Sequence, residues 1–482
     1  MFLIIWVSVL IAVTVIYLRQ VYSRFSRYGV KHLKPVPFLG NMTRLLLRVG
    51  VFYNVFILFF RFVGSFEFVT ELLVIRDIEL IKKITVKDFD HFIDHRFNFS
   101  TSDSYFSRNL FSLKGQTWRN MRSTLSPAFT GSKMRQMLPL MVAVGDQMMS
   151  SLHKMIKNSE SGLLDLDCKD LTTRYSIDVV ACCGYGLNVD SYNDEDNQFY
   201  ALGKGSSTFH SRQLFQSFVI GKAPKLAKIL KLDFLSELSK KFFKKLVLET
   251  MAERELRNIV RPDMLNQLIE AKKAWTDDDL IAQAALFFIA GVETVSSGMS
   301  FLLYELALNP EAQERLAQEI KETDAKNGGK LDLNSIETIP YMDMVVSEVL
   351  RLWPPGIAPD RKCTRDYNLE KSRSSDRISI PVFAIHRDPQ YFPNPDKFDP
   401  ERFSPENKHN IQPYTYFPFG VGPRNCVGTR FALCEMKLVA YQILQHMVIS
   451  PCEKTTIPAK LDKDTFNIRL EGGHWLKFRA RM

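Results

Sequence analysis

Apolar residues that recur every three to four positions dominate the middle of the chain and predict long helices. The clearest helical candidates are Lys133–Lys157, Ser236–Val260, Asp277–Leu308 and Pro310–Asn327. The last of these has Asn309 as its expected N-cap and proline at its first position. Short runs of strand character lie toward the two ends, at Glu71–Ile75, Arg377–Pro381 and Trp475–Phe478. Five prolines between Asp388 and Pro405 predict an irregular path there. The pattern favours a mainly α fold with minor β.

The amino-terminal residues 1–18 carry no charged side chain. As a helix they would extend roughly 27 Å, close to the thickness of a bilayer's hydrocarbon core. Basic residues follow at once, and Glu67 is the first acidic residue, an arrangement that holds the following chain in the cytosol. A cleaved secretory signal is the alternative, but it would carry its charges before the apolar run. We therefore expect a transmembrane anchor at 1–18, a basic, proline-containing linker at 19–40 and one large domain at 41–482. A second apolar run, Val49–Phe60, is too short to span and predicts a buried or interfacial helix.

Composition narrows the class of protein. Of 482 residues, 46% are hydrophobic and 24% charged, which is typical of a globular chain. The net charge of +10 is mild for this length and does not indicate nucleic-acid binding. Seven cysteines without a CxxC pair provide no ligand set for structural zinc or an iron–sulfur cluster, and they favour a reducing compartment.

One cysteine lies in an unusual passage, Phe417–Gly428, with the sequence FPFGVGPRNCVG. Glycines and a proline before Cys426 predict a tight turn, and a helical pattern, Thr429–Gln445, follows directly. Backbone N–H groups at a helix start stabilise a thiolate, and such a thiolate suits axial ligation of haem iron. Phe417 and Phe419 could shield one porphyrin face. The alternative is a buried structural cysteine.

This passage resembles the cysteine loop of cytochromes P450, and Ile84–Phe92 is similar to the microsomal insect branch, in particular its ninth family. The resemblance covers nearly the whole chain. It implies a single haem domain of cytochrome P450 fold behind the anchor, with haem b bound through Cys426 as metal ligand and Phe419 beside it. It also implies monooxygenation at the cytosolic face of the endoplasmic reticulum.

A second motif, Ala290-Gly291-Val292-Glu293-Thr294, lies within the predicted helix Asp277–Leu308 and resembles the oxygen-binding stretch of that family. Small side chains at Ala290 and Gly291 let a diatomic molecule approach the helix, and a mid-helix threonine bonds to a backbone carbonyl. The resemblance implies that Thr294 donates a proton during oxygen activation while Glu293 passes protons inward from solvent. Ordinary helix packing is the alternative for this motif alone.

Further residues take roles from the resemblance. Glu348 and Arg351 lie on one helical face, and Arg402 is expected to complete a buried structural triad with them. Trp118 and Arg122 are one helical turn apart and offer donors to a haem propionate. Arg361 and Arg424 match the other propionate positions.

Aromatic residues predict an apolar pocket and hence a lipophilic substrate. The candidates are Phe92, Phe97, Phe99, Tyr105, Phe106, Phe111, Phe209, Phe215, Phe218, Phe287 and Phe288, together with the segments 355–359 and 466–468. For each phenylalanine, ordinary core packing is the alternative. The stretch 366–386 is shorter than in the resembled family, and Ser372–Asp376 replaces its glycine turn.

The expected partners are NADPH–cytochrome P450 reductase, with cytochrome b5 as a second electron donor, the membrane, and no nucleic acid. Arg119, Arg430 and Lys437 would form a basic docking face. Lysines in 222–231 alternate with apolar residues, which suits either a membrane surface or a solvated helix face. Two other functions remain open: a haem-thiolate isomerase or dehydratase acting on peroxides, and a haem sensor without catalysis.

Overall fold

The computed structural model describes residues 2–42, 60–96, 105–194, 197–208, 213, 216, 219–221, 223–329, 331–367, 377–463, 465 and 467–481. Several predictions fall outside them: residues 49–59, Phe97, Phe99, Phe209, Phe215, Phe218, Lys222, Ser372–Asp376 and Phe466. Contacts divide the chain into two compact units. Unit 1 comprises Met1–Arg96, Gly356–Pro395 and Gln412–Asn425, and unit 2 comprises Phe97–Pro355, Asp396–Ile411 and Cys426–Met482.

Unit 1 is built on a four-stranded sheet in the order β1-β2-β5-β4. Its strands are β1 (Phe62–Glu67), β2 (Thr70–Ile75), β4 (Asp360–Lys362) and β5 (Arg377–Ser379). β1 and β2 form an antiparallel hairpin, β5 joins β2 in parallel, and β4 pairs antiparallel with β5. The helices are α1 (Phe2–Tyr22), α2 (Arg24–Arg27), α4 (Ile78–Lys82), η2 (Lys83–Lys87), η3 (Phe89–His91) and α18 (Val382–Ile385).

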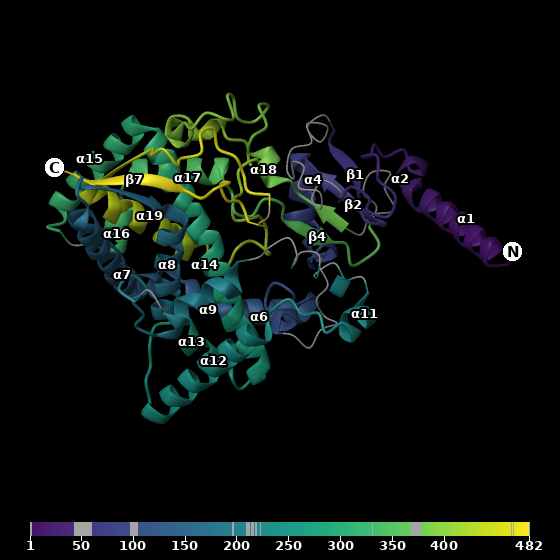
Figure 1. Ribbon diagram of the computed structural model, residues 1–482, viewed down its shortest axis with the longest axis horizontal. Helices are drawn as coiled ribbons and strands as arrows, with labels where there is room; N and C mark the ends of the chain where they lie inside the picture. Colours follow the sequence, from purple (N-terminus) through teal and green to yellow (C-terminus); the bar gives the residue numbers. More distant parts are fainter. Residues whose placement is uncertain are drawn as a thin grey trace. The chain divides into compact units, whose positions relative to one another are not determined.

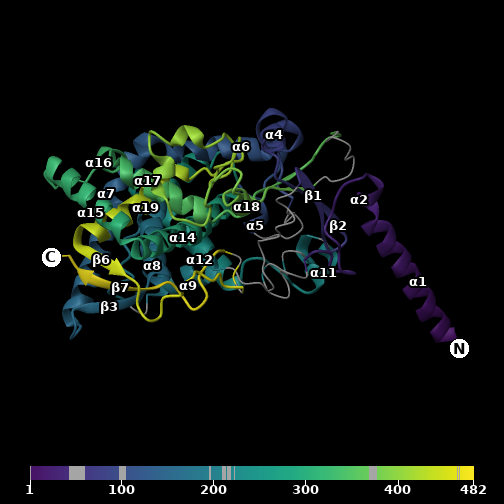
Figure 2. The same cartoon turned by 90° about the horizontal axis from the view of Figure 1, so that it is seen from above.

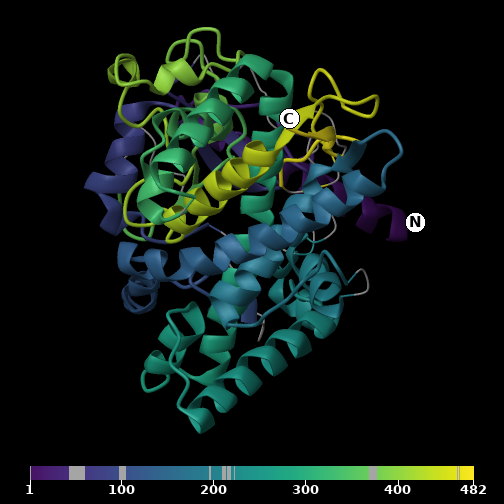
Figure 3. The same cartoon turned by 90° about the vertical axis from the view of Figure 1, so that its left-hand side faces the viewer.

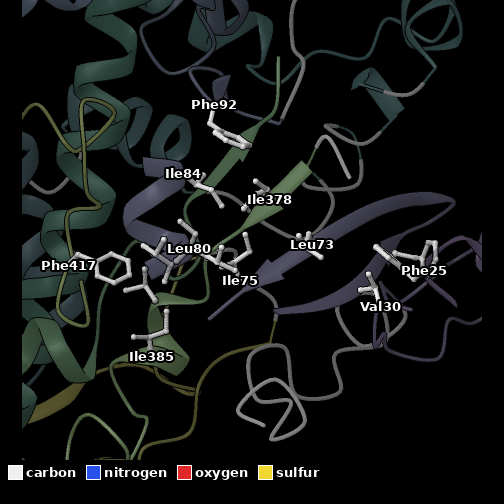
Figure 4. Close-up of a cluster of buried hydrophobic side chains, with 14 of the residues drawn as sticks. Phe25, Val30, Leu73, Ile75, Leu80, Ile84, Phe92, Ile378, Ile385 and Phe417 are labelled. Atoms are coloured by element: carbon white, nitrogen blue, oxygen red, sulfur yellow. The ribbon is translucent and has the colours of Figure 1, made fainter. Parts of the chain in front are cut away.

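A hydrophobic cluster fills this unit between the sheet and its short helices (Figure 4). Leu73 and Ile75 of β2 meet Leu80 of α4 and Ile385 of α18. Phe417, the candidate for shielding a porphyrin face, is buried in the same cluster. Phe92, a candidate for substrate contact, also packs there. Both aromatic residues therefore contribute to the core of unit 1.

Helix α1 leads away from the β1–β2 hairpin (Figure 2). It is a continuous apolar helix in which Leu18 and Val21 are the buried residues. Its length and hydropathy are sufficient to cross a membrane. The helix passes the predicted boundary at Leu18 by four residues and ends at Tyr22, well before the prolines of the linker.

Unit 2 is a helical assembly around α14 (Asp277–Leu308) (Figure 1). Around it are α5 (Tyr105–Arg108), α6 (Gly115–Leu125), η4 (Ser126–Phe129), α7 (Gly131–Asn158), α8 (Cys168–Val180), η5 (Ala181–Tyr185), α9 (Gln198–Ser207), α11 (Pro224–Ile229), α12 (Glu237–Arg257), α13 (Met264–Ala271), α15 (Pro310–Lys326), α16 (Leu333–Glu337), α17 (Pro340–Leu352), η6 (Pro400–Phe403), η7 (Lys408–Asn410) and α19 (Thr429–His446). A small antiparallel sheet has the order β3-β7-β6, with β3 (Leu163–Asp167), β6 (Met447–Ser450) and β7 (Trp475–Ala480).

Helix α14 is the central element of unit 2 because it packs against both α8 and α19. Figure 3 shows α19 as the yellow helix of this bundle. A capping box between Thr276 and Asp279 sets the start of α14. The helix is apolar and long enough to span a membrane, but most of it is buried within the protein, as is typical of a core helix. The long helices lie where the sequence predicts them, although the side chain of Asn309 makes no N-terminal cap and instead donates to the Glu305 carbonyl.

Candidate active site

Cys426 lies just before the first turn of α19, in unit 2. It is the only one of the seven cysteines whose residue surface is exposed. Surrounding protein nevertheless desolvates the thiol and raises its pKa, an effect that the Gly428 N–H, the Thr429 hydroxyl and the positive charge of Arg122 partly oppose. Burial therefore outweighs the stabilising donors. Coordination of the sulfur to a metal would remove this proton outright.

The turn before this cysteine depends on glycine, as its sequence predicts. Gly420 and Gly422 both adopt positive φ, 75° and 77°, a region that favours glycine. At Gly422 an added Cβ would lie 1.9 Å from the Thr85 carbonyl oxygen, so no larger residue fits. Phe419, the candidate for cofactor contact, is half-buried in this turn.

The middle of α14 carries an open face in an otherwise buried helix. Ala290 is exposed, and Gly291 and Thr294 are half-buried. The Thr294 hydroxyl donates to the Ala290 carbonyl at 2.6 Å. The threonine thus bonds to the backbone as its position in the motif predicts, and its hydroxyl lies beside the small residues that open the helix surface.

Glu293, next to Thr294 in the chain, lies instead in a buried charged cluster. Its side chain is 2% exposed. Arg469 donates to both carboxylate oxygens at 2.7 Å, and the ammonium of Lys169 lies 3.5 Å away. Burial lowers the pKa of Lys169 to about 8, against the attraction of Glu293. Glu293, the residue expected to pass protons inward from solvent, therefore has its carboxylate bound by Arg469 in this structure.

The four candidate propionate donors divide between the units. In unit 2, Trp118 is buried in α6, and Arg122 lies one turn later, half-buried and close enough to Cys426 for their charges to interact. In unit 1, Arg361 on β4 and Arg424 in the glycine turn are both buried. Arg424 donates to the Ile93 carbonyl at 2.8 Å.

One buried N–H group of Arg361 has no hydrogen-bond partner among the described residues. The guanidinium donates to the carbonyls of Asp360 and Val421, and the N–H group without a partner is that of Nε. Burial lowers the pKa of this guanidinium to about 10. An unpartnered guanidinium N–H that is removed from water suits an anionic ligand such as a carboxylate.

Glu348, Arg351 and Arg402 are brought together in unit 2. Arg351 binds Glu348 in bidentate fashion, at 2.7 and 2.8 Å, and both side chains are fully buried. Arg402 reaches the same carboxylate at 3.4 Å, and the Asp399 N–H donates to it at 2.9 Å. Glu348, paired with Arg351 on α17, therefore holds the proline-rich segment that contains η6 against this helix.

The aromatic residues proposed to line a pocket have mixed environments. Phe288 is fully buried among Phe199, Phe242 and Phe243, so it belongs to the core. Phe106 is buried and packs on Phe234, with ring centroids 4.0 Å apart. Tyr105 and Phe287 are half-buried, and Phe111 is exposed.

The three proposed basic docking residues differ in their exposure to solvent. Arg119 and Arg430 are exposed. Lys437 is buried and its ammonium pairs with Asp343. Its charge is therefore neutralised within the protein, which makes Lys437 unsuitable for docking a partner.

The chemistry of these residues fits a haem group. In unit 2, Cys426 offers a sulfur ligand, and α14 offers an open face with a hydroxyl beside it. In unit 1, Arg361 offers an N–H for a carboxylate, since this N–H has no partner among the described residues. Sequence reasoning missed Arg469 and Lys169 because neither belongs to a motif. Their positions beside Glu293 follow only from the tertiary structure.

Comparison with known proteins agrees with this chemistry. A family model described as Cytochrome P450 matches residues 31–474. The chain is 43% identical to cytochrome P450 9e2 of Blattella germanica, over 95% of this chain and 94% of the relative. It is 42% identical to the probable cytochrome P450 9f2 of Drosophila melanogaster, over 95% of each. Similarity extends to another insect group, with 37% identity to the probable cytochrome P450 6a13 of Drosophila melanogaster over 96% of each.

Proposed function

Because this chain belongs to the cytochrome P450 family of monooxygenases, we propose that Cys426 is the thiolate ligand of haem b and that the substrates are lipophilic small molecules. The observation that carries the proposal is the position of Cys426, the only one of the seven cysteines with an exposed residue surface, just before the first turn of α19. Haem supplies the binding and reductive activation of O2 and the insertion of one oxygen atom into substrate. Electrons would come from NADPH through a flavoprotein reductase, with cytochrome b5 as an additional donor.

Within this assignment the residues of the chain hold the cofactor and move protons. Arg122 and Trp118 from α6, and Arg361 and Arg424 from unit 1, would bind the propionates. Ala290 and Gly291 leave space for O2, and the Thr294 hydroxyl, now donating to Ala290, would donate toward that space. Glu293 would relay protons to Thr294 after its carboxylate separates from Arg469.

The apolar helix α1 supports anchoring of the protein in a membrane. We propose that this membrane is the endoplasmic reticulum, as the resemblance to microsomal insect P450s implies. The basic residues that follow the helix support a cytosolic location for the bulk of the chain. In domain terms, residues 1–18 would form the anchor, 19–40 the linker and 41–482 the haem domain. Arg119 and Arg430 remain as exposed basic residues for an acidic electron donor.

Reconstitution tests this function. The full-length protein in lipid vesicles with NADPH–cytochrome P450 reductase should consume NADPH and give an oxygenated product from a lipophilic substrate that shifts the Soret band. The labelled atom of ¹⁸O2 should appear in the product. Conversion of a lipid hydroperoxide without NADPH, to a product that contains no oxygen from ¹⁸O2 and no added oxygen atom, would favour the isomerase or dehydratase alternative. Haem binding without NADPH consumption would favour the sensor.

A further inference from the structure

His386 is a fully buried histidine that has no role in the mechanism above. It follows the last residue of α18, in unit 1. Its ring stacks on Tyr416, with centroids 5.3 Å apart, and meets Phe417 edge-on at 5.7 Å. Its Nε2 lies 3.0 Å from the backbone nitrogen of Phe417.

This hydrogen bond defines the state of the ring. The Phe417 nitrogen carries a proton and can only donate, so Nε2 must accept. His386 is therefore the neutral tautomer with its proton on Nδ1. A buried backbone N–H without an acceptor would be costly, and here a side chain rather than another backbone group satisfies it.

The residue that His386 holds begins the cysteine passage. Phe417 accepts from the Gly420 N–H at 2.9 Å, and Gly422 accepts from the Asn425 N–H at 3.0 Å. These two turns occupy most of the chain between Phe417 and Cys426. Close packing of Gly422 on the Thr85 carbonyl restrains the middle of the passage, while His386 restrains its beginning.

We propose that His386 is a positioning residue for Cys426: by accepting the Phe417 N–H it sets the path of the turn that leads to the sulfur. This inference rests on the proposed role of Cys426 as the haem ligand. It attributes the effect to the acceptor atom Nε2, not to the volume of the ring. These two contributions are separable because glutamine retains an acceptor without a ring, whereas phenylalanine retains a ring without an acceptor.

The test compares H386Q and H386F in the full-length holoenzyme. The measurements are the Soret position of the reduced CO complex, which reports thiolate ligation, and the ratio of haem to protein. We expect H386Q to retain the thiolate-type band and H386F to lose most of it. The ratio of the thiolate-ligated form to the form without this band should differ about tenfold between the two variants. The matched control is His153, whose ring nitrogen contacts the Met149 carbonyl on the exposed side of α7. Neither H153Q nor H153F should change the spectrum.

Hydrogen exchange at the Phe417 amide gives a second measurement that does not need the haem signal. It should be protected in wild type and in H386Q, and exchange about tenfold faster in H386F. A native H386F spectrum, or loss of the band in H386Q as well as in H386F, would overturn the positioning role. Wild-type protein without a thiolate-type band would instead remove the proposed function, and this inference with it.

Discussion

The triad of Glu348, Arg351 and Arg402 allows a quantitative prediction, because its two arginines contact one carboxylate in different environments. Glu348 and Arg351 are both 0% exposed and joined by two short hydrogen bonds. Arg402 is 11% exposed, and its Nε lies 3.4 Å from the Oε1 atom of Glu348. Removing one partner of a buried ion pair costs about 3–5 kcal/mol because the other charge stays buried and uncompensated.

Arg351→Leu should therefore lower the free energy of unfolding by about 3 kcal/mol, the low end of that range, since the Asp399 N–H and Arg402 still bind Glu348. Arg402→Leu should cost about 1 kcal/mol, the value of a single hydrogen bond. Glu348→Leu combined with Arg351→Leu should recover part of the loss, because no charge remains buried.

The assay is urea unfolding of the full chain in detergent, followed by tryptophan fluorescence and by haem release. Equal losses from Arg351→Leu and Arg402→Leu would refute the assignment of the main contribution to the buried bidentate pair. A double variant no more stable than Arg351→Leu would refute the explanation by uncompensated charge.

Three further predictions concern proton transfer and buried charge. Thr294→Ala should reduce the amount of product formed per NADPH by up to about 10²-fold, whereas Thr294→Ser should retain the wild-type value. Equal amounts of product per NADPH in both variants would contradict the role of the hydroxyl. Arg469→Leu should lower the free energy of unfolding by about 1–2 kcal/mol, less than for a fully buried pair, because Arg469 is 20% exposed. Arg479→Leu, which alters an exposed side chain of β7, should cost little, and similar urea midpoints for the two variants would contradict the prediction. Burial raises the pKa of Asp178 to about 7, and hydrogen bonds from Ser191 oppose this rise. Ionisation of Asp178 therefore disfavours the folded state. The stability that the protonated carboxyl contributes is lost as the pH rises from 3.8 to about 7. The Tm of Asp178→Asn should then increase relative to wild type across that interval, and a constant Tm difference would show that the carboxyl does not titrate as stated.

The long helices could be predicted closely from the sequence because burial repeats with the helical period. For α14 the predicted and observed limits coincide, since Thr276 and Asp279 form a cap that is local in sequence. Short strands were less predictable. β3 was missed because its pairing partner β7 lies about 300 residues later, and a five-residue strand carries little signal without that partner.

In the candidate site, too, contacts that are local in sequence were predictable and contacts between distant residues were not. The Thr294 bond to Ala290 spans four residues and could be predicted from a motif. The ion pair between Arg469 and Glu293 joins residues 176 positions apart, so no local sequence pattern indicated it. Lys437 was misjudged as a docking residue for a similar reason: its partner Asp343 lies on a different helix. The sequence shows a lysine's charge, but only the tertiary structure shows whether that charge is neutralised.

The reduced CO spectrum of the purified full-length protein, compared with that of Cys426→Ser, tests the central assignment most directly. We predict a thiolate-type Soret band in the wild type and its complete absence in the variant, with Cys434→Ser, which alters a buried thiol on the same helix, retaining the band. A thiolate-type band that survives in Cys426→Ser, or protein that binds no haem at all, would contradict it.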